Sequence, residues 1–155
     1  MFNTDGRGAE VKAYVDSSFD QRLNIAGIGI LIQDGQHERN FYLFTKAPSN
    51  NWAELFAIKM AGILTHNQAD IYTDSQTAIQ YINRQIGDKE RSKKQYIIHK
   101  QCELLAYEIR AQNLHIEKIK AHTHNFQLHP MGNRMADLNA KRGLARYYSL
   151  TYERK

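Results

Sequence analysis

Features that would place a chain outside the cell or in a membrane are missing from this sequence. Its single cysteine, Cys102, rules out a disulfide within the chain and fits a reducing compartment. The longest apolar runs, such as residues 26–32, are far too short to span a bilayer. The N-terminus lacks the charged region and the apolar segment of a secretory signal. We therefore expect an intracellular, cytoplasmic protein with no membrane partner.

The sequence also lacks an internal repeat, a low-complexity tract and a recognisable linker. Its 155 residues suffice for one domain with a hydrophobic core. A hydrophobic content of 42% and a charged content of 24% are typical of a globular protein. We predict a flexible polar lead over residues 1–10 and a single domain over residues 11–150.

Negative charge is the scarcer of the two signs. The chain has 16 Asp and Glu residues against 21 Lys and Arg residues, which gives a formal net charge of +5. This balance favours polyanionic partners, although a basic composition alone is weak evidence for nucleic-acid binding. Because several acids belong to a candidate site described below, the remaining surface is expected to be more basic than the total indicates.

Strand patterns fill the first part of the sequence, and helix patterns alternate with short strands after it. Residues 11–19, 26–33 and 40–46 are separated by short turn signals, so they predict an antiparallel three-stranded meander. The later apolar patterns predict helices over residues 52–66 and 75–86, a helix ending near residue 113, a helix over 133–147, strands over 69–73 and 114–119, and a loop over 120–131.

This order of elements predicts an α/β fold and the place of a ligand site. The expected sheet is mixed and five-stranded, with three antiparallel strands, then two parallel ones, and flanking helices. A right-handed crossover sets the fourth strand parallel to the first. Ligand sites in such sheets lie at the carboxyl ends of the strands, and Asp16 and Asp74 fall at or near those ends. The two aspartates should therefore meet if these strands are neighbours.

Four acidic residues stand in distinctive local contexts. Asp16 and Asp74 close strands, Glu54 lies on an apolar helix, and Asp137 lies on the last helix. Carboxylates that converge repel one another unless a cation neutralises them, and Mg²⁺ prefers oxygen ligands. The set therefore suggests phosphoryl-transfer chemistry. The alternative is four unrelated acids, with Asp74 as a helix N-cap, but an unpaired carboxylate on a buried helix is costly.

Three segments around these acids carry a family resemblance. Residues 49–55, Ser-Asn-Asn-Trp-Ala-Glu-Leu, are similar to the pattern Thr-Asn-Asn-x-x-Glu-Leu, and residues 72–76 read Tyr-Thr-Asp-Ser-Gln. Residues 132–137, Gly-Asn-Arg-Met-Ala-Asp, are similar to Gly-Asn-Glu-x-x-Asp. From about residue 11 to residue 148, the chain resembles the type 1 ribonuclease H (ribonuclease HI) family. The resemblance implies the ribonuclease H-like fold.

The resemblance also implies an activity. A member of this family would be an endonuclease that hydrolyses the RNA strand of RNA/DNA hybrids with two Mg²⁺ ions, leaving 5′-phosphate and 3′-hydroxyl ends. Mn²⁺ is a possible substitute. Asp16 would bridge both ions, Glu54 and Asp74 would complete one metal site, and Asp137 would complete the other. His122 would assist product release or proton transfer. We expect the protein to act as a monomer.

Substrate contacts are expected on both sides of the acids. The resemblance implies contacts from Ser17, Asn50, Asn51 and Gln76, the last two in the minor groove, where 2′-hydroxyl groups mark the RNA strand. A basic segment supplies Lys89, Arg91, Lys93 and Lys94, which either contact the DNA strand or form a solvated helix start. Gly27 and Gly29 match glycines of the family's second strand.

The sequence departs from the family pattern at several positions. Residues 16–18 read Asp-Ser-Ser where the family usually has Asp-Gly-Ser, and Arg134 replaces a glutamate. The loop before Asp137 holds His122, His124 and His129. A zinc site from these histidines is the less favoured interpretation, because the only cysteine lies far upstream and no compact fourth ligand is evident.

Two other functions fit the same fold. The first is a non-catalytic protein that binds hybrids or double-stranded RNA, but such a protein has no need for four repelling carboxylates. The second is a nuclease directed at DNA junctions or ends. The Asn-Asn pair at residues 50–51 and the Ser-Gln pair at residues 75–76 favour hybrid recognition over this second alternative.

Overall fold

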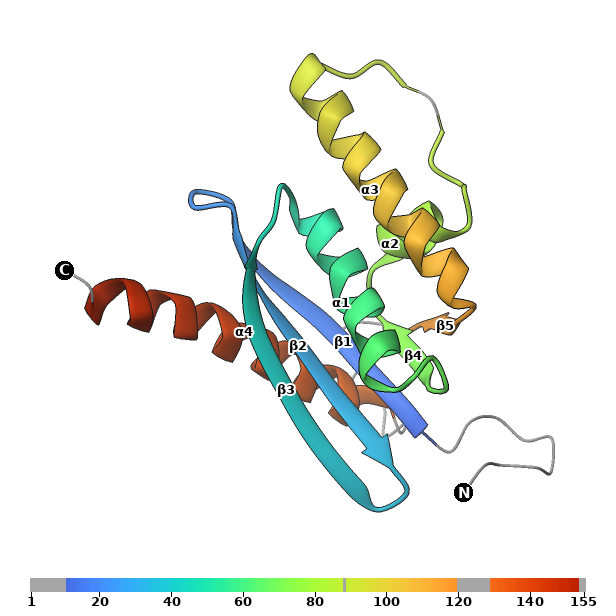
Figure 1. The fold of residues 1–155 in the computed structure, drawn as a ribbon, viewed down its shortest axis with the longest axis vertical. Coiled ribbons are helices and arrows are strands. Elements are labelled where there is room, and N and C mark those ends of the chain that lie inside the picture. Colours follow the sequence, from blue (N-terminus) through green and yellow to red (C-terminus); the bar gives the residue numbers. More distant parts are fainter. Residues whose placement is uncertain (1–10, 88, 120–128, 154–155) are drawn as a thin grey trace.

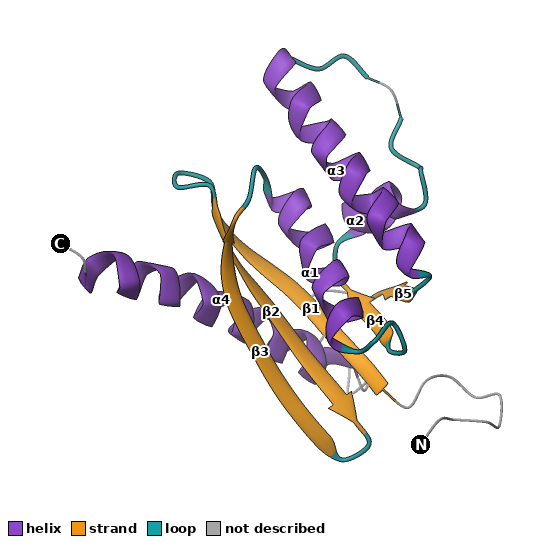
Figure 2. Ribbon diagram, in the orientation of Figure 1, coloured by secondary structure: helices purple, strands orange, loops and turns teal. Residues whose placement is uncertain are grey.

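The computed structural model describes residues 11–87, 89–119 and 129–153, so the predicted lead over residues 1–10 lies outside the described residues. A five-stranded sheet with strand order β3-β2-β1-β4-β5 is flanked by helices, as Figures 1 and 2 show. The elements are β1 (Val11–Asp20), β2 (Ile25–Asp34), β3 (His37–Lys46), α1 (Asn50–Leu64), β4 (Asp70–Thr73), α2 (Gln76–Ile82), α3 (Lys93–Gln112), β5 (His115–Lys118) and α4 (His129–Glu153).

The pairing of the strands confirms the predicted fold class. β1, β2 and β3 pair antiparallel, whereas β4 pairs parallel with β1 and with β5. The chain crosses from β3 to β4 through α1, so the fourth strand lies beside the first. Among the described residues, no helix is both long enough and apolar enough to cross a membrane.

Helices cover both faces of the sheet. Alternate residues of β1 point to opposite faces: Ala13 and Val15 pack in the core that contains Ile58 of α1, whereas Tyr14 packs with Ala136 of α4. In Figure 1, α1 and α3 lie on one side of the sheet and α4 crosses its other side. The sheet is therefore the middle layer of three.

Two glycines of β2 let α4 lie directly on the strand backbone. A Cβ atom at Gly27 would overlap the carbonyl oxygen of Ala140, and one at Gly29 would overlap the backbone of Ala136 and Ala140. Because only glycine lacks a Cβ atom, these positions permit the close approach of helix and strand. The contact fixes α4, and with it Asp137, relative to the sheet.

The bounds of several elements differ from the prediction, most of all those of two helices. The final helix begins at His129 rather than near residue 133, because Pro130 fits the first turn of a helix, where its missing N–H group is not needed. It also runs past residue 147 to Glu153, since neither glycine nor proline stops it there. On this stretch the Tyr147 ring packs edge-on against Phe44 of β3, at 5.4 Å between ring centroids.

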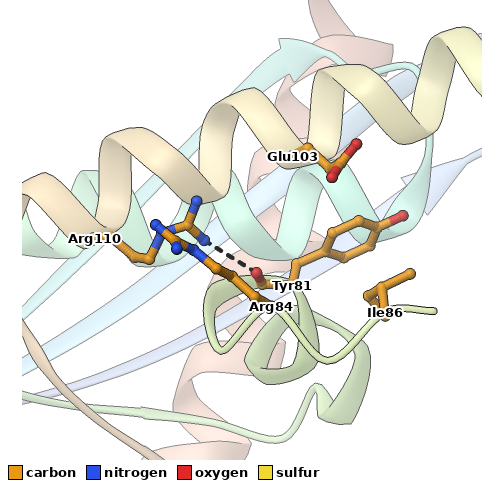
Figure 3. A pocket seen from close by; sticks show the side chains of 5 residues that line it. All are labelled: Tyr81, Arg84, Ile86, Glu103 and Arg110. Carbon is orange, nitrogen blue, oxygen red and sulfur yellow. Dashed lines mark hydrogen bonds between the residues drawn. The ribbon is translucent and has the colours of Figure 1, made fainter. Parts of the chain in front are cut away.

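The helix predicted over residues 75–86 ends earlier, at Ile82. Arg84 has a left-handed backbone with φ of 57°, which a continuing helix does not allow. Arg110 of α3 donates from Nη1 to the carbonyl oxygens of Tyr81 and Ile82, at 3.2 and 3.1 Å. Figure 3 shows this side chain at the wall of a pocket shared with Arg84 and Glu103. Arg110 therefore satisfies the exposed carbonyl groups at the end of α2.

Candidate functional site

Two aspartates occupy matching positions on neighbouring parallel strands. The pairing of β1 with β4 runs as far as Tyr14 and Tyr72, whose rings stack at 5.0 Å between centroids. Asp16 lies two residues after Tyr14 in β1 and on the same face of the strand, and Asp74 directly follows the end of β4. The two strands therefore carry both carboxylates to the same point, just beyond the last registered pair.

A third carboxylate reaches this point from α1. Ser49 is the N-cap of that helix and accepts a hydrogen bond from the Trp52 backbone N–H at 3.2 Å, which places Glu54 in the second turn. Ligand oxygens of Asp16, Glu54 and Asp74 lie within 4.8 Å of one another. Asp74 is not the N-cap of α2, because Ser75 accepts the capping hydrogen bond. The structure thus brings three of the four acids together.

Burial makes this cluster electrostatically unfavourable when all its members are ionised. Asp16 is 8% exposed and Glu54 is 6% exposed. Desolvation, followed by the charges of Glu54 and Asp74, raises the pKa of Asp16 to about 9. Desolvation also raises the pKa of Glu54 to about 7, partly opposed by the hydrogen bond from Ser17. A bound cation would remove the repulsion and favour the ionised form of each group.

The donor set fits a hard divalent cation. Glu54 Oε2 is buried and has no hydrogen-bond partner among the described residues, although an unpaired buried carboxylate oxygen is costly. Only carboxylate oxygens face one another in the group, which suits Mg²⁺ or Mn²⁺ better than a metal that prefers sulfur or imidazole ligands. The residues present are therefore compatible with metal binding.

The fourth acid lies outside this group of three. Asp137 is on α4, and its charge still contributes to raising the pKa of Asp16, so it lies within electrostatic reach. Its carboxylate accepts from Lys141 Nζ at 3.1 Å, one helical turn along. This pair is largely exposed to solvent, and such i,i+4 pairs contribute only about 0.3–0.5 kcal/mol. Replacing the Lys141 ion pair with another partner of Asp137, such as a cation, would therefore cost little free energy.

Ser17 and Asn50 adjoin the buried carboxylates. The Ser17 backbone N–H donates to Asp16 Oδ1 at 2.8 Å, and its hydroxyl lies 2.7 Å from Glu54 Oε1. The same hydroxyl lies 3.1 Å from Asn50 Oδ1, a second possible acceptor. Sequence reasoning treated Ser17 as a substrate contact and missed its contact with Glu54. The one available signal was the serine at the usual glycine position of the first motif.

The other predicted substrate residues are distributed over nearby surfaces. Gln76, the first residue of α2, is exposed. A groove of about 570 Å³ between α1, α2 and α3 is lined by Asn51, Lys89 and Arg91, among others. Lys93 and Lys94 line a second groove of about 440 Å³, together with residues of α3 and of the segments before β2 and after β3. Basic side chains therefore line two grooves near the start of α3.

The histidines predicted near the site are mostly outside the described residues. His122 and His124 fall there, whereas His129 is the first residue of α4. Sequence reasoning overlooked His99, which is 7% exposed and lines the groove of about 570 Å³. It shares a hydrogen bond of 2.9 Å with the Tyr81 hydroxyl. Its place on the apolar face of α3, three residues before Cys102, was the signal for burial.

The chain matches the model of a known protein family. A family model described as RNase H matches residues 8–145, which is most of the chain and includes all four acidic residues. The comparison with curated proteins found no match.

Proposed function

The chain belongs to the RNase H family, and we propose that it is a metal-dependent endonuclease that hydrolyses the RNA strand of RNA/DNA hybrids. Family membership supports nuclease activity on such hybrids. The expected products carry 5′-phosphate and 3′-hydroxyl ends. The observation that carries the proposal is the convergence of Asp16, Glu54 and Asp74 within 4.8 Å, two of them buried.

We assign the four acids to two metal sites. Asp16 would contribute to both sites, Glu54 and Asp74 would complete one, and Asp137 would complete the other. Bound Mg²⁺, or Mn²⁺ in its place, supplies activation of a water and stabilisation of the leaving oxygen in phosphoryl transfer. The protein's part is to hold the four carboxylates in place, and the bound cation would favour their ionised form. All four lie in one chain, which supports activity as a monomer.

Other side chains would bind and orient the hybrid. Asn51 and Gln76 are exposed, so their amide groups are available to 2′-hydroxyl groups in the minor groove. Asn50 is also exposed and would contact the substrate beside them. Lys89 and Arg91 line one groove and Lys93 and Lys94 the other, and these side chains would contact phosphates of the DNA strand. His122 would assist proton transfer or product release.

The proposal is tested by incubating the protein with labelled RNA/DNA hybrid, with and without Mg²⁺, beside DNA duplex and RNA duplex. Only the RNA of the hybrid should be cut, and only with the metal. Asp16→Asn and Asp74→Asn should reduce cleavage by several orders of magnitude, because each removes a metal-binding charge. Asp34→Asn is the matched control, since Asp34 is exposed at the end of β2.

The alternatives are distinguished by the same assay. Hybrid binding without any cleavage would support a non-catalytic binding protein. Cutting of the DNA duplex in preference to the hybrid would support a DNA-directed nuclease. Substantial Mg²⁺-dependent cleavage by Asp16→Asn would contradict the metal assignment.

A further inference from the structure

Ser17 lies between a predicted substrate contact and a predicted metal ligand. Its hydroxyl is 2.7 Å from Glu54 Oε1 and 3.1 Å from the Asn50 side-chain amide. We propose that Ser17 is a positioning residue that holds the Glu54 carboxylate oriented for metal binding and links it to Asn50. The inference rests on the proposed function only in taking Glu54 as a metal ligand.

The fold places these three side chains together for a simple reason. Asn50 and Glu54 are four residues apart on α1, so they share one face of the helix. Ser17 lies on the opposite face of β1 from Asp16, because successive strand residues alternate. That face is the one covered by α1, as the packing of Val15 in the same core shows. Ser17 is therefore the β1 residue that faces the Asn50–Glu54 side of the helix.

The number of protons on each group gives the contacts a direction. A serine hydroxyl has one proton and can donate to one acceptor only. The carboxylate oxygen at 2.7 Å is the closer and stronger acceptor. Asn50 Oδ1, at 3.1 Å, is the weaker, alternative acceptor of the same hydroxyl proton. Ser17 therefore lies between Asn50 and Glu54 in a chain of three side chains.

This chain leaves one oxygen of Glu54 for another partner. Oε1 accepts from Ser17, whereas Oε2 is buried with no hydrogen-bond partner among the described residues. A carboxylate with one oxygen fixed has fewer orientations, so its second oxygen is held ready. The Ser17 backbone N–H also donates to Asp16 Oδ1. Ser17 therefore contacts both buried carboxylates of the cluster, one through its backbone and one through its hydroxyl.

The test measures Mg²⁺ binding to the full chain without nucleic acid, by titration calorimetry. Ser17→Ala removes the hydroxyl and should weaken Mg²⁺ binding by about tenfold, as is usual for losing a side chain that supports a metal ligand. Ser17→Thr keeps a hydroxyl and should restore the affinity to within about twofold of the original. Ser18→Ala, on the opposite face of β1, is the matched control and should bind Mg²⁺ like the unaltered protein.

A second measurement separates positioning from substrate contact. Hybrid affinity is measured in EDTA for the same variants, with thermal unfolding as a check that each is folded. A positioning role predicts that Ser17→Ala changes Mg²⁺ affinity and leaves hybrid affinity nearly unchanged. The reverse result, weaker hybrid binding with unaltered Mg²⁺ affinity, would overturn the proposal and leave Ser17 as a substrate contact.

The link to Asn50 is tested by a double-mutant cycle on Mg²⁺ affinity. Asn50→Ala should weaken binding less than Ser17→Ala, and the double variant should resemble Ser17→Ala alone, because the Asn50 effect passes through the hydroxyl. Strict additivity would contradict the link. None of these measurements requires cleavage, so failure of the protein to cleave RNA would contradict the proposed function and leave the result on Ser17 intact.

Discussion

Asp16 is the described carboxylate with the largest rise in pKa, to about 9, caused by desolvation and by two neighbouring acids. In metal-free protein the folded state therefore retains a proton that the unfolded state releases above its ordinary pKa of 3.8. The contribution of this proton to the free energy of unfolding is largest below about pH 4 and declines as the pH rises towards 9. Burial of the acid cluster therefore lowers the stability of the metal-free protein at neutral pH.

Asp16→Asn should remove that decline. In EDTA the variant should become more stable than the original protein as the pH rises, with a gain of at least about 1 kcal/mol between pH 5 and pH 9, close to the value of one pKa unit. Urea unfolding at several pH values measures it. Added Mg²⁺ at pH 8 should stabilise the original protein far more than the variant. A stability difference that stays constant with pH would show that Asp16 titrates normally.

His122 is the residue-scale prediction that falls outside the described residues. His122→Ala should slow hybrid cleavage by about 10²-fold at most, within the range for losing one acid–base group, and should leave Mg²⁺ affinity unaltered. His124→Ala and His129→Ala should do much less. Cleavage rates of the three single variants decide which histidine assists catalysis. A larger loss of rate for His124→Ala than for His122→Ala would assign that role to His124.

Local contexts were enough to select the three acids that converge, but not to describe their neighbours. Asp16 and Asp74 could be paired because Asp16 lies in a strand, and Asp74 directly after a strand, that topology makes parallel neighbours. Glu54 could be added because a carboxylate on an apolar helix is costly unless it has a partner. The contact of Ser17 with Glu54 depends on the distance between β1 and α1, which no local pattern encodes. The separation of Asp137 from the other three depends in the same way on the position of α4.

At the scale of elements, the packing of α4 on β2 gives a sharp mutational test. Gly29→Ala should destabilise the protein by about 1–3 kcal/mol, because the added methyl group meets backbone atoms that cannot rotate away. Gly87→Ala is the matched control, since a Cβ atom there meets nothing within 4 Å, and it should change stability by less than about 0.5 kcal/mol. Urea unfolding compares the two. Equal effects would mean that α4 can move away from the strand.

The order and type of the elements followed from the sequence, whereas several boundaries did not, among them the end of α2 and both ends of α4. Apolar periodicity and turn signals identify an element, but its ends depend on contacts with other elements. The end of α2 is stabilised by Arg110, a residue of α3 far along the chain. The last turns of α4 pack against β3 through Tyr147. The local sequence pattern around each boundary does not reveal the contact that affects it.

At the scale of the whole molecule, the excess of positive charge should govern hybrid affinity. Neutralising Lys89, Arg91, Lys93 and Lys94 together should weaken binding and flatten the plot of log affinity against log salt, by up to about 0.9 for each phosphate that the protein no longer neutralises. The control neutralises four exposed basic residues elsewhere, Arg39, Lys46, Lys118 and Arg146. If both sets flatten the slope equally, net charge acts without a defined surface and the segment is a solvated helix start.

The registered pairing of β1 with β4 also has a consequence for synthesis of the chain. The first three strands can pair with their neighbours as soon as they leave the ribosome, but β4 follows only after α1. A nascent chain that ends before β4 already contains Asp16 and Glu54, yet it has no Asp74 and no parallel strand to align the two. Non-local pairing of this kind is slow to form. The cluster of three carboxylates is therefore absent from the half-made protein and forms only once β4 has paired with β1.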